Sequence, residues 1–161
     1  MLVCDNRGGF VLSIRTLLRT ASIVAALQFA AHAAAVLTYK PSHGSNENAV
    51  IAAMRGSSFH FGGPFARSYW EMYSGYALLP AVTCLIEAIL FWLLSEAKSP
   101  AQLVRQIVLL FFGANLVHAA IVVRYFFPIP LYFDVAIMIC LALVLLRMKK
   151  ESSAALFTST E

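Results

Sequence analysis

Six polar side chains stand inside long apolar runs of this chain, and they are the residues best suited to do chemistry. They are Gln28, His32, Glu87, Asn115, His118 and Asp134. A charged or strongly polar group at bilayer depth costs about 2.5–3.5 kcal/mol on insertion scales. Such groups therefore face the interior of a helix bundle and commonly mark a functional site. The sequence indicates one polar site inside a membrane domain.

Proton transfer is the first chemistry that these residues suggest. Glu87 is the expected proton donor or acceptor, because a carboxyl group held away from water is suited to acid–base work near neutral pH. His118 or His32 would be its partner, or would carry protons to the membrane surface. Alternatively, Glu87, Asn115, Gln28 and the histidines simply hydrogen-bond across helices and hold the bundle together. Both interpretations stay open on the sequence alone.

Metal and redox chemistry have weaker support. His32 and His118 match in depth on different helices, as two axial haem ligands would, but no second histidine pair accompanies them. Two histidines with Glu87 or Asp134 could hold zinc, although their spacing is scattered. We expect no cofactor, with haem and zinc as alternatives. The three cysteines form no CxxC pair, which argues against a dithiol oxidoreductase or a disulfide framework.

Four apolar runs must position these residues. Of the 161 residues, 60% are hydrophobic and 12% are charged, and about 20 apolar residues of helix cross a bilayer. The expected spans are 20–39, 73–94, 103–125 and 129–146. The fold predicted is an all-α membrane protein, an antiparallel four-helix transmembrane bundle in one domain, 1–150, followed by a flexible polar tail, 151–161. Counting along the spans places Gln28, Glu87 and Asn115 in one layer.

The basic residues predict the orientation. Eight lie on one side of the membrane: Arg7, Arg15, Arg19, Lys98, Arg105, Arg147, Lys149 and Lys150. The other four lie opposite, so both termini are expected in the cytoplasm and the protein in the inner cell membrane. The net charge is +4, but the basic residues form no continuous stripe, so we expect no nucleic-acid partner. In a rival interpretation, the first span is a signal peptide cleaved near Ala31-His32-Ala33.

Residues 40–72 are expected to form a short helical and aromatic cap on the outer side. Ser45 or Asn46 should N-cap a short helix that runs through Arg55 and ends at Gly56. Aromatic rings that suit the membrane–water boundary follow it: Phe59, Phe61, Phe65, Tyr69, Trp70 and Tyr73.

Four residues at or near this cap complete the expected ligand-binding set. Arg67 and His60 could hold an anionic head group or a carboxylate. Alternatively, Arg67 pairs with Glu71 at i, i+4 spacing and, with Trp70, anchors the chain at the interface. Tyr76 lies on the stripe of the second span that leads to the polar site.

One element resembles a known family. Arg67-Ser68-Tyr69-Trp70-Glu71-x-Tyr73-x-Gly75 is similar to an element of small bacterial four-span membrane proteins. The resemblance implies the four-span fold and a role for this element, without an established activity. The layout also resembles the sterol-isomerase and sigma-2 type four-helix family, and DoxX-like proteins. The first of these implies a lipid-sized cavity with Glu87, Asn115, His118 and Trp92 as candidates.

Three functions follow as hypotheses. The preferred one is a protein that binds an apolar small molecule (a lipid, isoprenoid or quinone) in a polar-lined intramembrane pocket. The second is a membrane enzyme that uses Glu87 and a histidine for proton transfer, as in double-bond isomerisation. The third is a non-catalytic subunit or assembly factor of a membrane complex. The expected partners are the lipid bilayer and the apolar ligand, and a homo-oligomer or a membrane-complex partner stays open.

Overall fold

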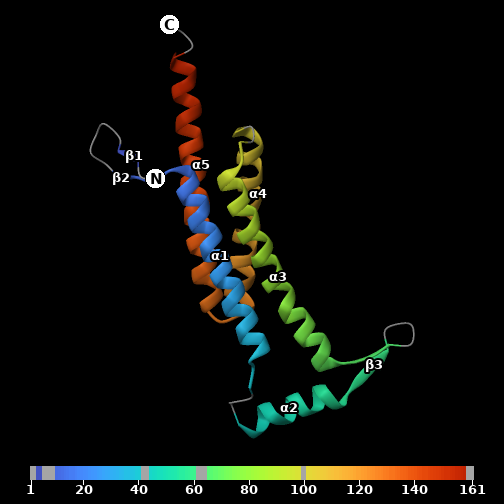
Figure 1. Ribbon diagram of the computed structural model, residues 1–161. Helices are drawn as coiled ribbons and strands as arrows, with labels where there is room; N and C mark the ends of the chain where they lie inside the picture. The colour runs from blue at the N-terminus through green and yellow to red at the C-terminus, as the bar shows by residue number, and fades with distance from the viewer. Residues whose placement is uncertain (1–2, 5–9, 41–43, 61–64, 99–100, 159–161) are drawn as a thin grey trace. The chain divides into compact units, whose positions relative to one another are not determined.

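The structure, a computed structural model, describes residues 3–4, 10–40, 44–60, 65–98 and 101–158, with side chains between 12 and 153 (Figure 1). The helices in these ranges are α1 (Ile14–Leu37), α2 (Ser45–Gly56), α3 (Tyr69–Glu96), α4 (Ala101–Tyr125) and α5 (Ile129–Thr158). The strands are β1 (Val3–Cys4), β2 (Phe10–Val11), β3 (Ser58–His60) and β4 (Ala66–Ser68). Each strand pairs antiparallel with its neighbour in sequence, β1 with β2 and β3 with β4. Arg7, Phe61 and the last residues of the expected tail, 159–161, lie outside the described residues.

Helices α1, α3, α4 and α5 are long and apolar enough to cross a membrane. The most apolar stretch of each has a mean hydropathy between 1.6 and 2.5. These helices confirm the predicted all-α fold with four candidate spans. Their length and composition are those of a multi-pass integral membrane protein.

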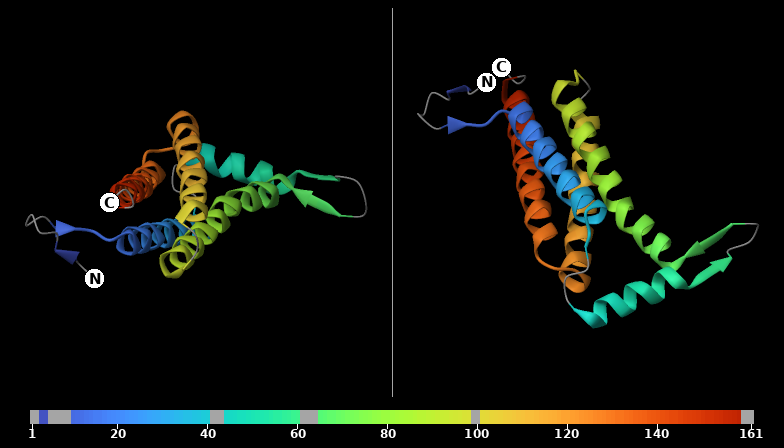
Figure 2. Two further views of the ribbon diagram at one scale, coloured as in Figure 1. Left: turned by 90° about the horizontal axis from the view of Figure 1, so that it is seen from above. Right: turned by 60° about the horizontal axis from the view of Figure 1, so that its bottom comes forward.

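The chain divides into two compact units, and the first contains residues 1–28 and 85–161. It combines the first part of α1, the second part of α3, and all of α4 and α5. Each helix contributes fully buried side chains to one core, for example Leu18, Phe91, Val108 and Leu141. Phe91 meets Phe111 edge to face, with ring centroids 5.5 Å apart. Helices α4 and α5 run side by side as a hairpin (Figure 2).

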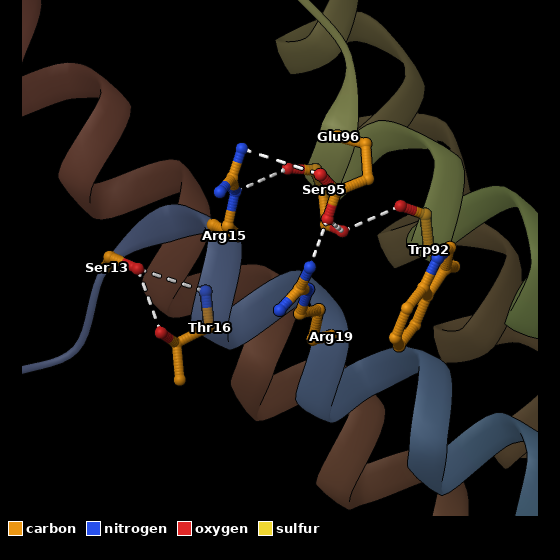
Figure 3. Close-up of polar contacts among 7 residues, drawn as sticks. All are labelled: Ser13, Arg15, Thr16, Arg19, Trp92, Ser95 and Glu96. Atoms are coloured by element: carbon orange, nitrogen blue, oxygen red, sulfur yellow. Dashed lines mark hydrogen bonds and ion pairs between the residues drawn. The ribbon is translucent and has the colours of Figure 1, made fainter. Parts of the chain in front are cut away.

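Polar contacts extend α1 beyond its apolar run (Figure 3). The helix begins at Ile14, before the expected start at 20, because the Ser13 hydroxyl accepts the Thr16 N–H at 3.1 Å as a helix cap. Arg15 and Arg19 both bind the Glu96 carboxylate at the end of α3.

Helix α5 also runs further than its apolar stretch suggests, past 146 to Thr158. Ser152 and Ser153 each donate a hydroxyl hydrogen bond to the carbonyl four residues earlier, at 3.0 and 3.1 Å. These bonds satisfy the hydroxyl groups within the helix, so polar residues there do not end it.

The second unit, 29–84, contains the end of α1, α2, the β3–β4 hairpin and the start of α3. Helix α2 is capped by Gly44 at φ 95°, with no side-chain cap bond. The expectation that Ser45 or Asn46 caps this helix was therefore wrong. The entry into α2 needs a positive φ that glycine adopts without strain.

A capping box opens α3 at Tyr69, before the expected residue 73. The Glu71 carboxylate accepts the Ser68 N–H at 2.7 Å, and the Ser68 hydroxyl accepts the Glu71 N–H at 3.2 Å. This reciprocal pair satisfies two backbone donors of the first turn and fixes where α3 begins.

Candidate functional site

The buried carboxylate of Asp134 links three helices of the first unit. Its Oδ1 accepts a hydrogen bond from Gln28 Nε2 of α1 at 3.0 Å. Its Oδ2 shares a hydrogen bond with His118 Nδ1 of α4 at 2.9 Å. Only 1% of Asp134 and 6% of Gln28 are exposed. Both oxygens of a carboxylate on α5 are thus held by side chains from other helices.

A second buried bond joins α3 to α4. Asn115 Nδ2 donates to Glu87 Oε1 at 3.2 Å and to the Phe111 carbonyl at 3.0 Å. Electrostatic interaction reaches from Glu87 to both Asp134 and His118. The structure therefore brings together Gln28, Glu87, Asn115, His118 and Asp134, which we call the polar cluster.

Helical geometry explains how the sequence produces this cluster. Asn115 and His118 are three residues apart on α4, so both project from one face. That face also carries the buried Ala119 and Val122. The apolar positions bury this face against neighbouring helices, and the two polar side chains are carried inward with it.

His118 differs from the other members of the polar cluster in its exposure. Its Nδ1 is bonded to Asp134, yet 42% of its side chain is exposed. No hydrogen bond joins its Nε2 to any residue that the structure describes. The ring is thus held in one orientation and keeps a free polar atom on its accessible side.

His32 lies in the second unit, where its half-buried ring bonds through Nε2 to the Ala77 carbonyl of α3 at 2.7 Å. This contact satisfies one ring nitrogen within its own unit. Among the described residues, no three His, Cys, Asp or Glu side chains are grouped so that they could hold a metal ion.

The expected cap residues all lie in the second unit, some at a small pocket and Trp70 in a separate group of aromatic rings. Arg67 and Tyr76 line a pocket of about 200 Å³ with Phe59, Phe65 and Met72. His60 is exposed on β3.

The Trp70 ring centroid lies 5.8 Å from that of Tyr39 and 5.7 Å from that of Tyr73, with the rings tilted at 41° and 33°. The Arg55 guanidinium lies 4.9 Å from the Trp70 ring centroid. No salt bridge between Arg67 and Glu71 is among the described contacts. Glu71 binds Ser68 in the capping box, and Arg67 acts on its carboxylate only through a longer electrostatic interaction.

Trp92 lies near the end of α3, where α3 contacts the start of α1 in the first unit. It is 46% exposed, and the Arg19 guanidinium lies 4.9 Å from its ring centroid (Figure 3). Five residues of helix, about 7.5 Å, separate Trp92 from Glu87 along α3. Its described contacts are with the Arg19 guanidinium and, through its carbonyl, with the Ser95 hydroxyl at 2.7 Å.

Sequence reasoning missed two buried serines of the first unit, Ser95 near the end of α3 and Ser22 on α1. Ser22 is 6% exposed and donates to the Ala88 carbonyl of α3 at 2.6 Å. Its only sequence signal was a small polar residue between alanines in an apolar run, a pattern that favours close helix packing.

These features define a multi-pass membrane protein with a polar cluster inside its helix bundle. In comparisons with known proteins, no family model, no curated protein and no solved structure matches the chain. The chemistry of the polar cluster is therefore the basis for a proposed function.

Proposed function

We propose that this membrane protein binds an apolar small molecule of the lipid, isoprenoid or quinone type, whose polar head contacts His118. One observation carries the proposal. The His118 ring is held by Asp134 at 2.9 Å, while 42% of the side chain remains exposed inside an apolar helix. Such a ring is oriented by the protein and keeps its second nitrogen available to a ligand.

The neighbours of His118 support a binding role. Asp134 orients the ring, and Gln28 in turn holds the second oxygen of Asp134. Binding sites place a few polar groups in an apolar lining, and their precision depends on supporting hydrogen bonds of this kind. His118 lies seven residues before the end of α4, about 10 Å, at a depth that apolar molecules reach.

Proton transfer is the second candidate, and it rests on Glu87. This carboxyl is 8% exposed and interacts electrostatically with His118. Asn115 is the one hydrogen-bond donor to Glu87 in the described part of the chain. A carboxyl and a histidine around one bound molecule could move a proton from one carbon to another, as double-bond isomerisation requires.

The proposed location is the inner cell membrane with both termini in the cytoplasm. The start of α1 and the end of α3 lie at one end of the first unit, where Arg15 and Arg19 bind Glu96. Arg105 near the start of α4 and Arg147 on α5 add to the same side in the sequence-based count. The positive-inside rule supports the cytoplasm for that side.

Native mass spectrometry of the detergent-purified protein tests the binding proposal. The unmodified protein should retain an apolar molecule, and His118→Phe should retain much less. Val123→Phe is the matched control, because it adds the same ring at a 69% exposed position of α4. Equal retention in both variants, or no retained molecule in any form, would refute the proposal and favour a packing or assembly role.

A third variant separates binding from catalysis. Glu87→Gln keeps an acceptor oxygen for Asn115, so ligand retention should be unchanged. If the protein is an isomerase, this variant should retain the substrate form of the molecule in place of the product. Unchanged composition of the retained molecule would count against proton transfer by Glu87.

A further inference from the structure

We infer that the head group of the bound molecule is a hydrogen-bond acceptor, a carbonyl oxygen above all, that takes the Nε2–H of His118. This inference rests on the proposed function and adds the chemical class of the ligand. It follows from the charge of the His118–Asp134 pair, from the position of its protons, and from the accessible side of the ring.

The Asp134–His118 pair is expected to be neutral overall. Asp134 is 1% exposed, and a lone carboxylate at such a position is very costly because it has lost its hydration. Its described hydrogen-bond partners are Gln28, which is neutral, and His118, and the Glu87 carboxyl that interacts with both can add only negative charge. The pair therefore avoids the cost of a buried net charge only if Asp134 and His118 together are neutral.

The protons are the second step. Oδ1 accepts the Gln28 bond, and no described residue offers an acceptor for a proton on Oδ1. Two neutral arrangements then remain: an imidazolium beside a carboxylate, or an imidazole beside a carboxylic acid that donates from Oδ2 to Nδ1. In the first, both ring nitrogens carry a proton. In the second, Oδ2 carries one proton and Nε2 the other, since a neutral imidazole has one N–H. Nε2 carries a proton in both, and Oδ1 accepts the Gln28 bond in both.

Accessibility is the third step. Nδ1 is occupied by Asp134, so Nε2 is the ring atom left for a ligand. No described residue of the chain offers Nε2 an acceptor. A ligand oxygen would accept the Nε2–H and complete the hydrogen bonding of the ring. An ammonium group has only donors and could not accept this bond.

Three probes of equal chain length test this inference: a long-chain methyl ketone, the matching alkane and the matching primary amine. Saturable binding of each is measured by native mass spectrometry. A hydrogen bond between neutral groups corresponds to roughly a twofold to tenfold gain in affinity, and one from an imidazolium to roughly a tenfold to hundredfold gain. The ketone should therefore bind at least about twofold more tightly than the alkane, and more tightly than the amine.

Two substitutions assign the preference to His118. His118→Phe should abolish the advantage of the ketone over the alkane, while Val123→Phe should keep it. His118→Gln supplies an amide N–H and should restore part of the advantage. If His118→Phe does not fold, the comparison of the three probes on the unmodified protein remains decisive.

The outcomes separate the two proposals. Absence of saturable binding by both the ketone and the alkane would overturn the proposed function. Binding of both with equal affinity would overturn only the inference about the head group. An amine that binds as tightly as the ketone, or a ketone preference that survives in His118→Phe, would overturn the inference as well.

Discussion

Replacing Asp134 by alanine should destabilise the helix bundle, because this carboxylate joins three helices. The substitution removes the acceptor of Gln28 Nε2 at 3.0 Å and the partner of His118 Nδ1 at 2.9 Å. Hydrogen bonds between membrane helices contribute about 0.6 kcal/mol on average and up to about 1.7 kcal/mol each. Two such bonds predict a loss of about 1–3 kcal/mol in the free energy of unfolding.

The assay is reversible unfolding in mixed micelles with an increasing fraction of dodecyl sulfate, followed by tryptophan fluorescence. Asp134→Asn is the matched control, since its amide oxygen can accept from Gln28 while its amide nitrogen donates to the His118 ring. It should retain at least half of the lost stability. A double-mutant cycle of Asp134→Ala with Gln28→Ala should show a coupling of about 0.5–2 kcal/mol.

Two results would contradict this reasoning. One is a loss below about 0.5 kcal/mol in Asp134→Ala, which is the range of surface substitutions away from special features. The other is an equal loss in Asp134→Asn, which would show that shape and not hydrogen bonding matters at this position.

Three further predictions concern the second unit. Ser68→Ala should cost about 0.5–2 kcal/mol at the start of α3, seen as faster hydrogen exchange of its first turn, and unchanged exchange would contradict the capping box. In thermal melts, Gly44→Ala should lower the stability by about 1–3 kcal/mol, because the backbone there has φ 95° and ψ −167°. Gly56→Ala is the control, since the added carbon has no heavy atom within 4 Å, and it should not destabilise α2 in the same measurement. The hydrogen bond to the Glu47 carboxylate raises the pKa of Tyr39 above its usual 10.0, so that contact is complete at neutral pH and is lost as the pH rises through this pKa; Glu47→Gln should lower the pKa in an NMR titration of the ring, and an unchanged value would contradict the contact.

The spans could be predicted from the sequence because the length of an apolar run is a property of the chain alone. The third expected span, 103–125, agrees with α4 at Ala101–Tyr125 to within two residues. The ends of the other helices could not be predicted as well. They depend on local polar contacts, such as the Ser13 cap of α1.

Five of the six residues expected at one polar site do come together in the polar cluster, since polar groups in apolar helices turn away from lipid. His32 was expected there too, but it lies in the second unit and bonds to Ala77. The pairing within the polar cluster was not predictable. Gln28 was expected in a layer with Glu87 and Asn115, yet it bonds to Asp134. Partner choice depends on how far each helix rotates about its axis, and a spacing of three or four residues does not determine that rotation.

The second unit was predicted least well. The β3–β4 hairpin pairs Ser58 with Ser68 across strands of only three residues, too short for an alternating pattern to be recognised. The capping box of Ser68 and Glu71 could have been found, because a serine followed three residues later by a glutamate is a known helix start. The sequence analysis considered Glu71 only as a partner of Arg67 and did not consider it as part of a capping box.

In the first unit, α1 meets α3 at a position of small side chains. Ala21 and Ala25 are completely enclosed one turn apart, and the Ser22 hydroxyl between them reaches the Ala88 carbonyl. Small residues of this kind let two helix backbones approach closely. A bulkier side chain in place of Ala21 or Ala25 would therefore push the neighbouring helices apart.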